Sequence, residues 1–209
     1  MVGFFRKGPT LPRLAPETKI ERRRQLVDAA RRCVAERGFA SLTVDDVCLE
    51  AGVSKGAFYG YFEGKQDLLL ALLDDEADDV RATLRSLDDD RLGGIERVRR
   101  FAREMVRRGD DPAGLQIRAD LWAEVNANPL VRERWADVVR ERRAVLRSWI
   151  EEAVASGDLE PIPANALAAI LLALSDGLML HAGLDPSGFR WANVSKALDA
   201  ILDGIRATT

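Results

Sequence analysis

Apolar residues recur three or four positions apart along most of the chain, which is the spacing of side chains that share one face of an α-helix. The clearest stripe lies within residues 129–156 and consists of Val131, Trp135, Val138, Arg142, Val145, Trp149 and Ala153. No segment keeps the strict alternation of apolar and polar residues that is typical of a half-buried β-strand. The pattern therefore predicts an all-α fold.

Turn-forming residues mark the ends of the predicted helices. The breaks include Asn128-Pro129, Gly157-Asp158 and Asp185-Pro186, and a proline at the start of a helix costs no hydrogen bond. We predict helices at residues 17–37, 44–51, 54–62, 65–87, 95–108, 112–126, 129–156, 163–183 and 191–206. Residues 1–16 contain three prolines and no apolar periodicity, so we expect a disordered arm there.

A tight turn joins the second and third predicted helices. Thr43 and Asp46 have the spacing of a capping box at the start of the second helix. Gly52 follows the end of that helix, where a residue with positive φ is favoured. Ser54 is a good N-cap for the helix that comes next. This segment has the local signals of a helix-turn-helix.

The third predicted helix has one small, polar side, formed by Lys55, Gly56, Ala57 and Gly60, and an aromatic side formed by Phe58 and Phe62. Two glycines inside a helix cost about 1 kcal/mol each relative to alanine. This cost is understandable if a bulky object has to approach the backbone. Tyr59, Tyr61 and Lys65 surround the small side with hydroxyls and a charge. A helix that enters the major groove of DNA needs such a side, with phosphate donors at its rim.

Residues 17–65 resemble the DNA-binding domain of the TetR family of transcriptional regulators. The resemblance is carried by AERGF at the end of the first helix, by LTVDDV, by EAGVSKGAFYGYF and by the following GK. It implies phosphate contacts from Thr43, Tyr59, Tyr61 and Lys65, and an approach to base edges by Lys55, Gly56 and Gly60. Ala57 belongs to the same expected DNA-binding set, although many members have Ser or Thr at this position. Plain three-helix packing without DNA binding is the alternative.

The charge is unevenly distributed along the chain. The whole sequence has a net charge of −3, but residues 1–60 carry 11 Lys and Arg against 7 Asp and Glu, whereas residues 61–209 carry 20 against 27. The basic part coincides with the predicted helix-turn-helix, as expected for a protein that binds nucleic acid. We therefore expect a three-helix DNA-binding domain at residues 17–63, which binds a palindromic double-stranded operator as a homodimer.

Residues 64–209 are expected to form a helical domain for effector binding and dimerisation. The helix at 163–183 is rich in Ala and Leu and carries almost no charge, so most of its sides should be buried. Together with 191–206 it would form a four-helix interface with a second copy; burial within one monomer is the alternative. The segment LWAEVNANPLVRERW resembles a recurrent group of TetR effector domains.

The resemblance also implies a pocket for a small, largely apolar effector. Met and Trp side chains suit such pockets, and the candidate lining is Phe101, Met105, Leu121, Trp122, Trp135, Trp149, Met179 and His181. The same residues could instead form a solid core, in which case a protein partner would control the regulator. The expected function is that of a repressor released from its operator by a ligand.

The remaining chemistry of the sequence argues against an enzyme. No phosphate-binding loop, paired-cysteine motif or nucleophile elbow is present. His181 is the only histidine, and Asp176 lies five positions before it, on a different helix face. Neither a cofactor nor a metal is expected. With no signal peptide and no apolar run close to the ~20 residues of a membrane span, we expect a cytoplasmic protein without membrane contact.

Overall fold

The computed structural model describes residues 16–109, 112–185 and 187–206. Within these ranges the chain forms α1 (Pro16–Ser41), α2 (Val44–Ala51), α3 (Lys55–Tyr59), α4 (Lys65–Leu87), α5 (Gly94–Gly109), α6 (Pro112–Ala127), α7 (Pro129–Ala155), α8 (Ala164–Leu184) and α9 (Trp191–Gly204). The all-α prediction is confirmed, since the described ranges contain no strand and only an isolated bridge between Leu159 and Arg206. Apart from Pro16, the predicted arm at 1–16 lies outside the described residues.

One helix end differs clearly from its predicted position. The backbone of Gly38 is non-helical, with φ 76° and ψ 158°, so the first helical stretch ends there as predicted, and a short second stretch counted within α1 continues across this kink to Ser41. The third helix is shorter than predicted and ends at Tyr59. Beyond Gly60, the amides of Tyr61 and Phe62 both donate to the carbonyl of Phe58, at 2.9 and 3.0 Å. This turn keeps both residues beside α3 without continuing the helix.

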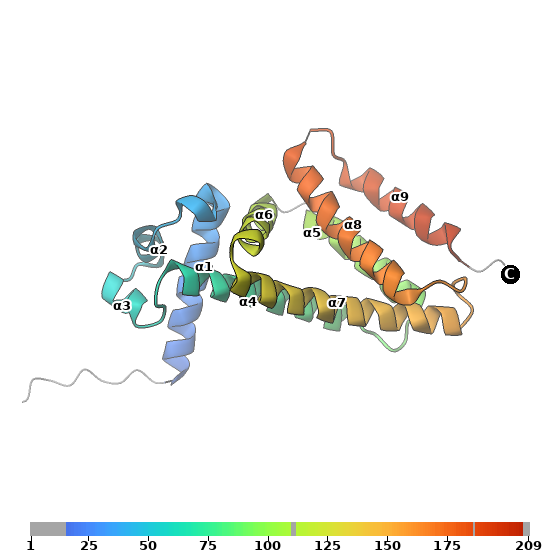
Figure 1. Ribbon diagram of the computed structural model, residues 1–209, viewed down its shortest axis with the longest axis horizontal. Coiled ribbons are helices and arrows are strands. Elements are labelled where there is room, and N and C mark those ends of the chain that lie inside the picture. The colour runs from blue at the N-terminus through green and yellow to red at the C-terminus, as the bar shows by residue number, and fades with distance from the viewer. Residues whose placement is uncertain (1–15, 110–111, 186, 207–209) are drawn as a thin grey trace, which may run out of the picture.

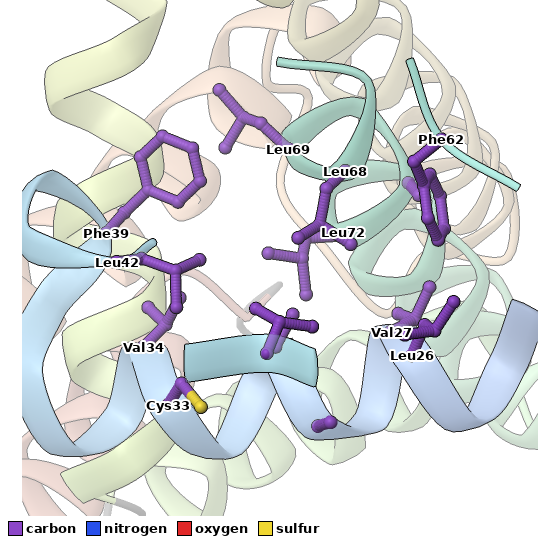
Figure 2. Close-up of a cluster of buried hydrophobic side chains, with 14 of the residues drawn as sticks. Leu26, Val27, Cys33, Val34, Phe39, Leu42, Phe62, Leu68, Leu69 and Leu72 are labelled. Atoms are coloured by element: carbon purple, nitrogen blue, oxygen red, sulfur yellow. The ribbon is translucent and has the colours of Figure 1, made fainter. Parts of the chain in front are cut away.

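The first buried cluster joins α1, α2 and α3 to the beginning of α4. Figure 2 shows Leu26 and Val34 of α1 facing Leu68 and Leu72 of α4, with Phe62 packed beside them. The cluster extends beyond these helices to residues of α6 and α7, namely Ile117, Val125, Val131 and Trp135. The apolar core therefore continues across residue 63, and the predicted division of the chain at that residue stays a prediction.

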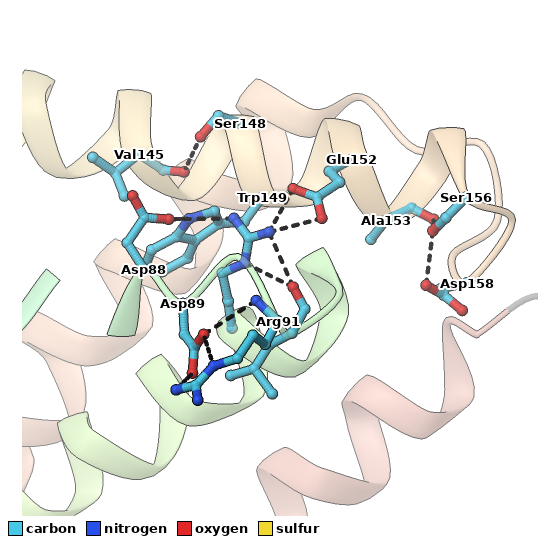
Figure 3. A network of polar contacts seen from close by, with 12 residues as sticks. Asp88, Asp89, Arg91, Val145, Ser148, Trp149, Glu152, Ala153, Ser156 and Asp158 are labelled. Carbon is cyan, nitrogen blue, oxygen red and sulfur yellow. Dashed lines mark hydrogen bonds and ion pairs between the residues drawn. The ribbon is translucent and has the colours of Figure 1, made fainter. Parts of the chain in front are cut away.

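A second buried cluster joins α5, α7, α8 and α9 at the other end of the elongated molecule (Figure 1). A polar network closes this end (Figure 3). There the indole N–H of Trp149 donates to Asp88 Oδ1 at 2.8 Å. Arg97, which is buried, donates to both carboxylate oxygens of Glu152 at 2.8 Å. These bonds fix the start of α5 against α7 and tie Trp149 into the core.

Helix α8 is long and apolar enough to cross a membrane, by length and composition alone. It is the one such helix in the described ranges, and the sequence analysis had expected none. One side of α8 is buried, with Leu171 and Leu172 in the second cluster. Its other side leaves Ile170 60% and Leu184 74% exposed. An exposed apolar side of this kind indicates a surface that another molecule covers.

Candidate nucleic-acid interface and internal cavity

Thr43 caps α2 and forms both halves of the predicted capping box. The amide of Asp46 donates to Thr43 Oγ1 at 3.1 Å, and the amide of Thr43 donates to Asp46 Oδ2 at 3.0 Å. The hydroxyl of Thr43 also donates to Asp46 Oδ2 at 2.5 Å. The two hydrogen bonds that Thr43 donates to Asp46 lower the pKa of the Asp46 carboxyl. The bond from the hydroxyl has the larger effect and the bond from the amide the smaller. Because the Thr43 hydroxyl proton is engaged by Asp46, a phosphate contact would have to displace that bond.

The turn between α2 and α3 depends on Gly52. Its φ of 65° and ψ of 36° are left-handed, and residues other than glycine adopt this conformation at a cost. The turn delivers Ser54, whose hydroxyl oxygen accepts from the amide of Ala57 at 3.2 Å and caps α3. The sequence thus places α3 at a fixed angle on α2.

Helix α3 has one buried anchor and one exposed side. Phe58 is 0% exposed and packs on Phe62, with their ring centroids 5.5 Å apart. Lys55, Gly56, Ala57 and Gly60 are all exposed, and Tyr59 beside them is 57% exposed. The structure therefore brings these five predicted contact residues together at the surface.

Among the described residues, no contact requires position 56 to be glycine. A Cβ atom added there would meet no atom closer than Ser54 Oγ at 3.9 Å, and the residue's φ is not in the left-handed range. The missing side chain lowers helix propensity by about 1 kcal/mol without relieving an internal clash. Its remaining effect is to let an external body come close to the backbone of α3.

Three predicted contact residues, Lys55, Lys65 and Tyr61, are engaged within the protein. The Lys55 ammonium lies 2.7 Å from Asp45 Oδ1 in an exposed ion pair, and exposed pairs contribute only about 0–1 kcal/mol. Lys65 donates to the carbonyl of Ala40 at 2.9 Å and lies 4.6 Å from the centre of the Phe39 ring. Tyr61 packs half-buried against the first cluster. Lys55 can exchange its partner easily, whereas Lys65 has two contacts to give up.

A cavity of about 520 Å³ lies between α4, α5, α6, α7 and α8. This volume falls within the ~300–1,000 Å³ range of small-molecule sites. Five of the candidate residues line it, namely Phe101, Met105, Trp122, Trp135 and Met179. Trp122 and Trp135 meet edge to face, with centroids 6.4 Å apart.

Two of the three other candidate residues do not line the cavity. Trp149 belongs to the second core cluster and to the network with Asp88. His181 is exposed on α8 and does not line the cavity. The side chain of Leu121 lies outside the described part of the chain. Periodicity assigned Trp149 and Trp135 to one stripe of α7, but the stripe is covered by different helices along its length.

The cavity is more polar than the sequence suggested. Its wall includes three acids and three arginines, which the candidate list did not contain: Glu76, Glu104, Asp176, Arg108, Arg118 and Arg142. The signal that could have found this feature was Arg142, an arginine in an otherwise apolar stripe. Among the described residues, no group of three or more His, Cys, Asp or Glu side chains is suited to hold a metal ion.

Two polar links connect α1 to the helices around the cavity. At the kink of α1, the amide of Phe39 donates to Asp120 Oδ2 of α6 at 2.7 Å. Earlier in α1, Arg31 pairs with Asp75 and lies 3.9 Å from Glu76, both on α4. Glu76 is buried and lies 3.4 Å from Arg118 of α6. A shift of α6 would therefore change the polar contacts of α1.

Comparison with known proteins finds transcriptional regulators for both the N-terminal and the C-terminal part of the chain. Residues 26–72 match the family model described as "Bacterial regulatory proteins, tetR family", and residues 94–207 match "BetI-type transcriptional repressor, C-terminal". The chain is similar to the HTH-type transcriptional repressor Rv1474c of Mycobacterium tuberculosis, with 25% identity over 94% of this chain and 99% of that protein. It is 26% identical to the HTH-type transcriptional repressor AcnR of Corynebacterium diphtheriae, over 90% of this chain and 93% of that protein.

Solved structures agree on the fold. A transcriptional regulator from Pseudomonas aeruginosa superposes with a TM-score of 0.77 and 28% identity, covering 92% of each chain. A TetR transcription regulator from Haloarcula marismortui superposes with a TM-score of 0.81 and 18% identity, over 90% of this chain and 99% of that one. At the latter identity the likeness concerns the fold alone.

Proposed function

The chain belongs to the TetR family of DNA-binding transcriptional regulators, and we propose that it is a homodimeric repressor that leaves a palindromic operator when a small molecule occupies the internal cavity. The observation that carries this proposal is the exposed side of α3. Its small residues are held outwards by the buried Phe58, and Gly56 leaves space that only an external body can use. The major groove of DNA is such a body.

We propose that Lys55, Gly56, Ala57 and Gly60 lie against base edges and that Tyr59, Tyr61, Thr43 and Lys65 lie near phosphates. The exposed positions of the first four and of Tyr59 support this assignment. Tyr61 and Lys65 are less free, because one packs on the core and the other bonds to Ala40. Their phosphate contacts would need a rearrangement on binding.

The exposed apolar side of α8 supports a dimer. Ile170 lies on it, Leu180 and Leu184 are exposed and also line the cavity, and Ile201 of α9 is 59% exposed. Both helices bury their other sides in the same core cluster. A second copy that covers these residues would bring two α3 helices to one duplex, as a two-fold operator requires. This cover also accounts for the apolar length of α8 in a cytoplasmic protein.

The switch would act through α6 as well as α4. Both helices line the cavity, and both are linked to α1 by the bonds at Asp120 and Glu76. Half-sites one helical turn apart require about 34–36 Å between the recognition helices, so a small rotation spoils simultaneous docking. A ligand that prefers the unbound form by about 1–3 kcal/mol relaxes repression roughly 5- to 150-fold. By linkage, DNA weakens ligand binding by the same factor.

A catalytic role is not part of the proposal, because the relatives are transcriptional regulators. Control by a protein partner alone is the second candidate. The exposed side of α8 would suit such a partner, but the cavity would then have no role. The cavity therefore favours a small-molecule effector.

Replacing Lys55 should relax sequence preference. Lys55→Ala is expected to cost about 1–3 kcal/mol at one base pair per half-site, since a lysine suits the acceptor edge of guanine. Selection from random duplexes, followed by sequencing, measures the preference of the variant and of the unchanged chain. Asp45→Ala breaks the same ion pair but keeps the amine, and it should leave the selected motif as it was. An identical motif from Lys55→Ala would mean that Lys55 does not read a base.

Removing the Asp120 carboxylate should loosen α1 from α6. Asp120→Ala leaves the amide of Phe39 without its acceptor, and we expect a loss of about 1–3 kcal/mol in the free energy of unfolding. Chemical denaturation measures this loss, and hydrogen exchange at Phe39 should accelerate. Asp137→Ala is the control, because that exposed carboxylate on α7 pairs only with its neighbour Arg140 among the described residues. An unchanged exchange rate at the Phe39 amide would show that Asp120 does not link α1 to α6.

A further inference from the structure

Arg142 is a buried arginine whose side chain makes no hydrogen bond to any described residue. It projects from α7 into the wall of the cavity and is 8% exposed. Within the described part of the chain no acceptor lies at hydrogen-bond distance, and the Nε atom is enclosed without a partner. The carboxylate that faces it, Asp176 on α8, lies 3.8 Å from Nη1. This separation is an ion pair without a hydrogen bond.

The other two arginines of the cavity do have acceptors. Arg108 donates to Thr83 Oγ1 at 2.5 Å and lies 3.5 Å from Glu104. Arg118 lies 3.4 Å from Glu76 and donates to the carbonyl of Arg108 at 3.2 Å. Each of these arginines thus pairs with one acidic residue of the cavity wall. Arg142 is the cavity arginine that lacks an acceptor among the described residues.

A buried guanidinium without an acceptor is unfavourable. It has five N–H donors and does not lose its proton in proteins, and burying a charge that is incompletely paired costs several kcal/mol, as a rough figure. Burial lowers the pKa of Arg142, with Asp176 opposing the effect. Burial also raises the pKa of Asp176, with Arg142 opposing it.

We propose that the effector is an amphiphilic anion, with a carboxylate held by Arg142 and an apolar body held among Phe101, Met105, Trp122, Trp135 and Met179. The proposal rests on the proposed function, since it names the ligand class of the same cavity. A carboxylate matches the planar fork of a guanidinium through two parallel hydrogen bonds. The aromatic and thioether side chains supply the apolar surface that the remainder of the ligand buries.

A cationic ligand fits the cavity less well. Aromatic walls attract cations, but Glu76 and Glu104 already face Arg118 and Arg108. Only Asp176 would be left for the cation, and Arg142 and Arg118 both act on that carboxylate electrostatically. The three acids and three arginines of the wall balance in charge, and each acid already faces an arginine, so the wall offers a positive ligand head no free carboxylate. Arg118 Nε and Trp135 Nε1 in the wall are also buried without a partner among the described residues, but Arg142 is the cavity arginine whose whole guanidinium lacks an acceptor there, and an anion meets that group.

Calorimetry on the full chain without DNA tests the ligand class. The probes are saturated carboxylates from hexanoate to tetradecanoate, the alcohols of the same lengths, and the alkyltrimethylammonium ions of the same lengths. We expect a carboxylate to bind the unchanged chain more tightly than the alcohol and the ammonium ion of its length. Arg142→Met should weaken carboxylate binding roughly 10- to 150-fold, the value of hydrogen bonds to a charged group, and should leave alcohol binding unchanged.

Arg147→Met is the matched control, because Arg147 is exposed on the same helix and pairs with Glu151; it should bind every probe normally. Thermal unfolding of each variant checks that it is folded. The proposal is overturned if no carboxylate binds the unchanged chain, if an ammonium ion binds best, or if Arg142→Met binds carboxylates as before. Operator affinity is then measured with and without the bound carboxylate. Binding that depends on Arg142 but leaves operator affinity unaltered would refute the switch and keep the ligand class.

Discussion

A chain that carries both Ile170→Lys and Ile201→Glu should sediment as a monomer and bind its operator about 100- to 10,000-fold more weakly than the unchanged chain. Ile170 of α8 and Ile201 of α9 are exposed apolar residues on the sides that the proposed second copy covers. Charges there would be buried on association, and such burial is strongly unfavourable. A monomer reaches only one half-site at a time and loses the gain from binding two linked sites.

Sedimentation velocity measures the assembly of this variant, and titration of a fluorescent operator duplex measures its affinity. Leu130→Lys is the control, because Leu130 is 50% exposed near the start of α7 and belongs to neither α8 nor α9. It should remain dimeric and bind normally. If the double variant were a monomer with undiminished operator affinity, two-fold binding would be wrong. If it stayed dimeric, the interface would lie elsewhere.

Phe58→Ala should lower the free energy of unfolding by about 3–5 kcal/mol, the usual cost of removing a buried phenylalanine side chain. Phe58 is completely buried, and it joins the exposed side of α3 to the core formed with α1 and α4. Since native proteins are stable by about 5–15 kcal/mol, this loss is a large part of the total. Operator binding should fall with it, because the recognition helix loses its anchor.

The neighbouring residue Tyr59 separates stability from binding. Tyr59 is 57% exposed, so Tyr59→Ala should change the free energy of unfolding by no more than about 0.5 kcal/mol while weakening DNA binding. Urea denaturation and operator titration of both variants give the comparison. Similar losses of stability in the two variants would show that Phe58 is not the anchor of α3.

The sequence predicts where α2 begins and ends and where α3 begins, because these positions have local chemical causes. Thr43, Gly52 and Ser54 act as predicted at the ends of α2 and α3. Gly60, where the third helix ends earlier than predicted, and Gly38, where a short helical stretch follows the predicted end, are the informative cases. Glycine permits both the end of a helix and a kink, and tertiary contacts decide between them. At Gly38 the amide of the next residue bonds to Asp120, 81 positions further along the chain, a partner that no local pattern reveals.

The site is less predictable than the fold, because burial on a helix face does not specify what covers that face. The stripe on α7 is buried as predicted at Trp135, Arg142 and Trp149. However, Trp135 and Arg142 reach the cavity, whereas Trp149 lies in the core and bonds to Asp88. The partners of Lys55 and Lys65 also come from other segments. Donors identified by sequence can thus be engaged within the folded chain.

The most direct test of the account is to measure how many chains bind a selected duplex, and how tightly. We predict that selection from random DNA yields an inverted repeat, that two chains bind each duplex, and that half-site centres lie about 34–36 Å apart. Scrambling one half-site should then lower the affinity about 100- to 10,000-fold. Failure to enrich any sequence, or one chain per duplex with an affinity indifferent to the scrambled half-site, would contradict the proposed homodimeric repressor.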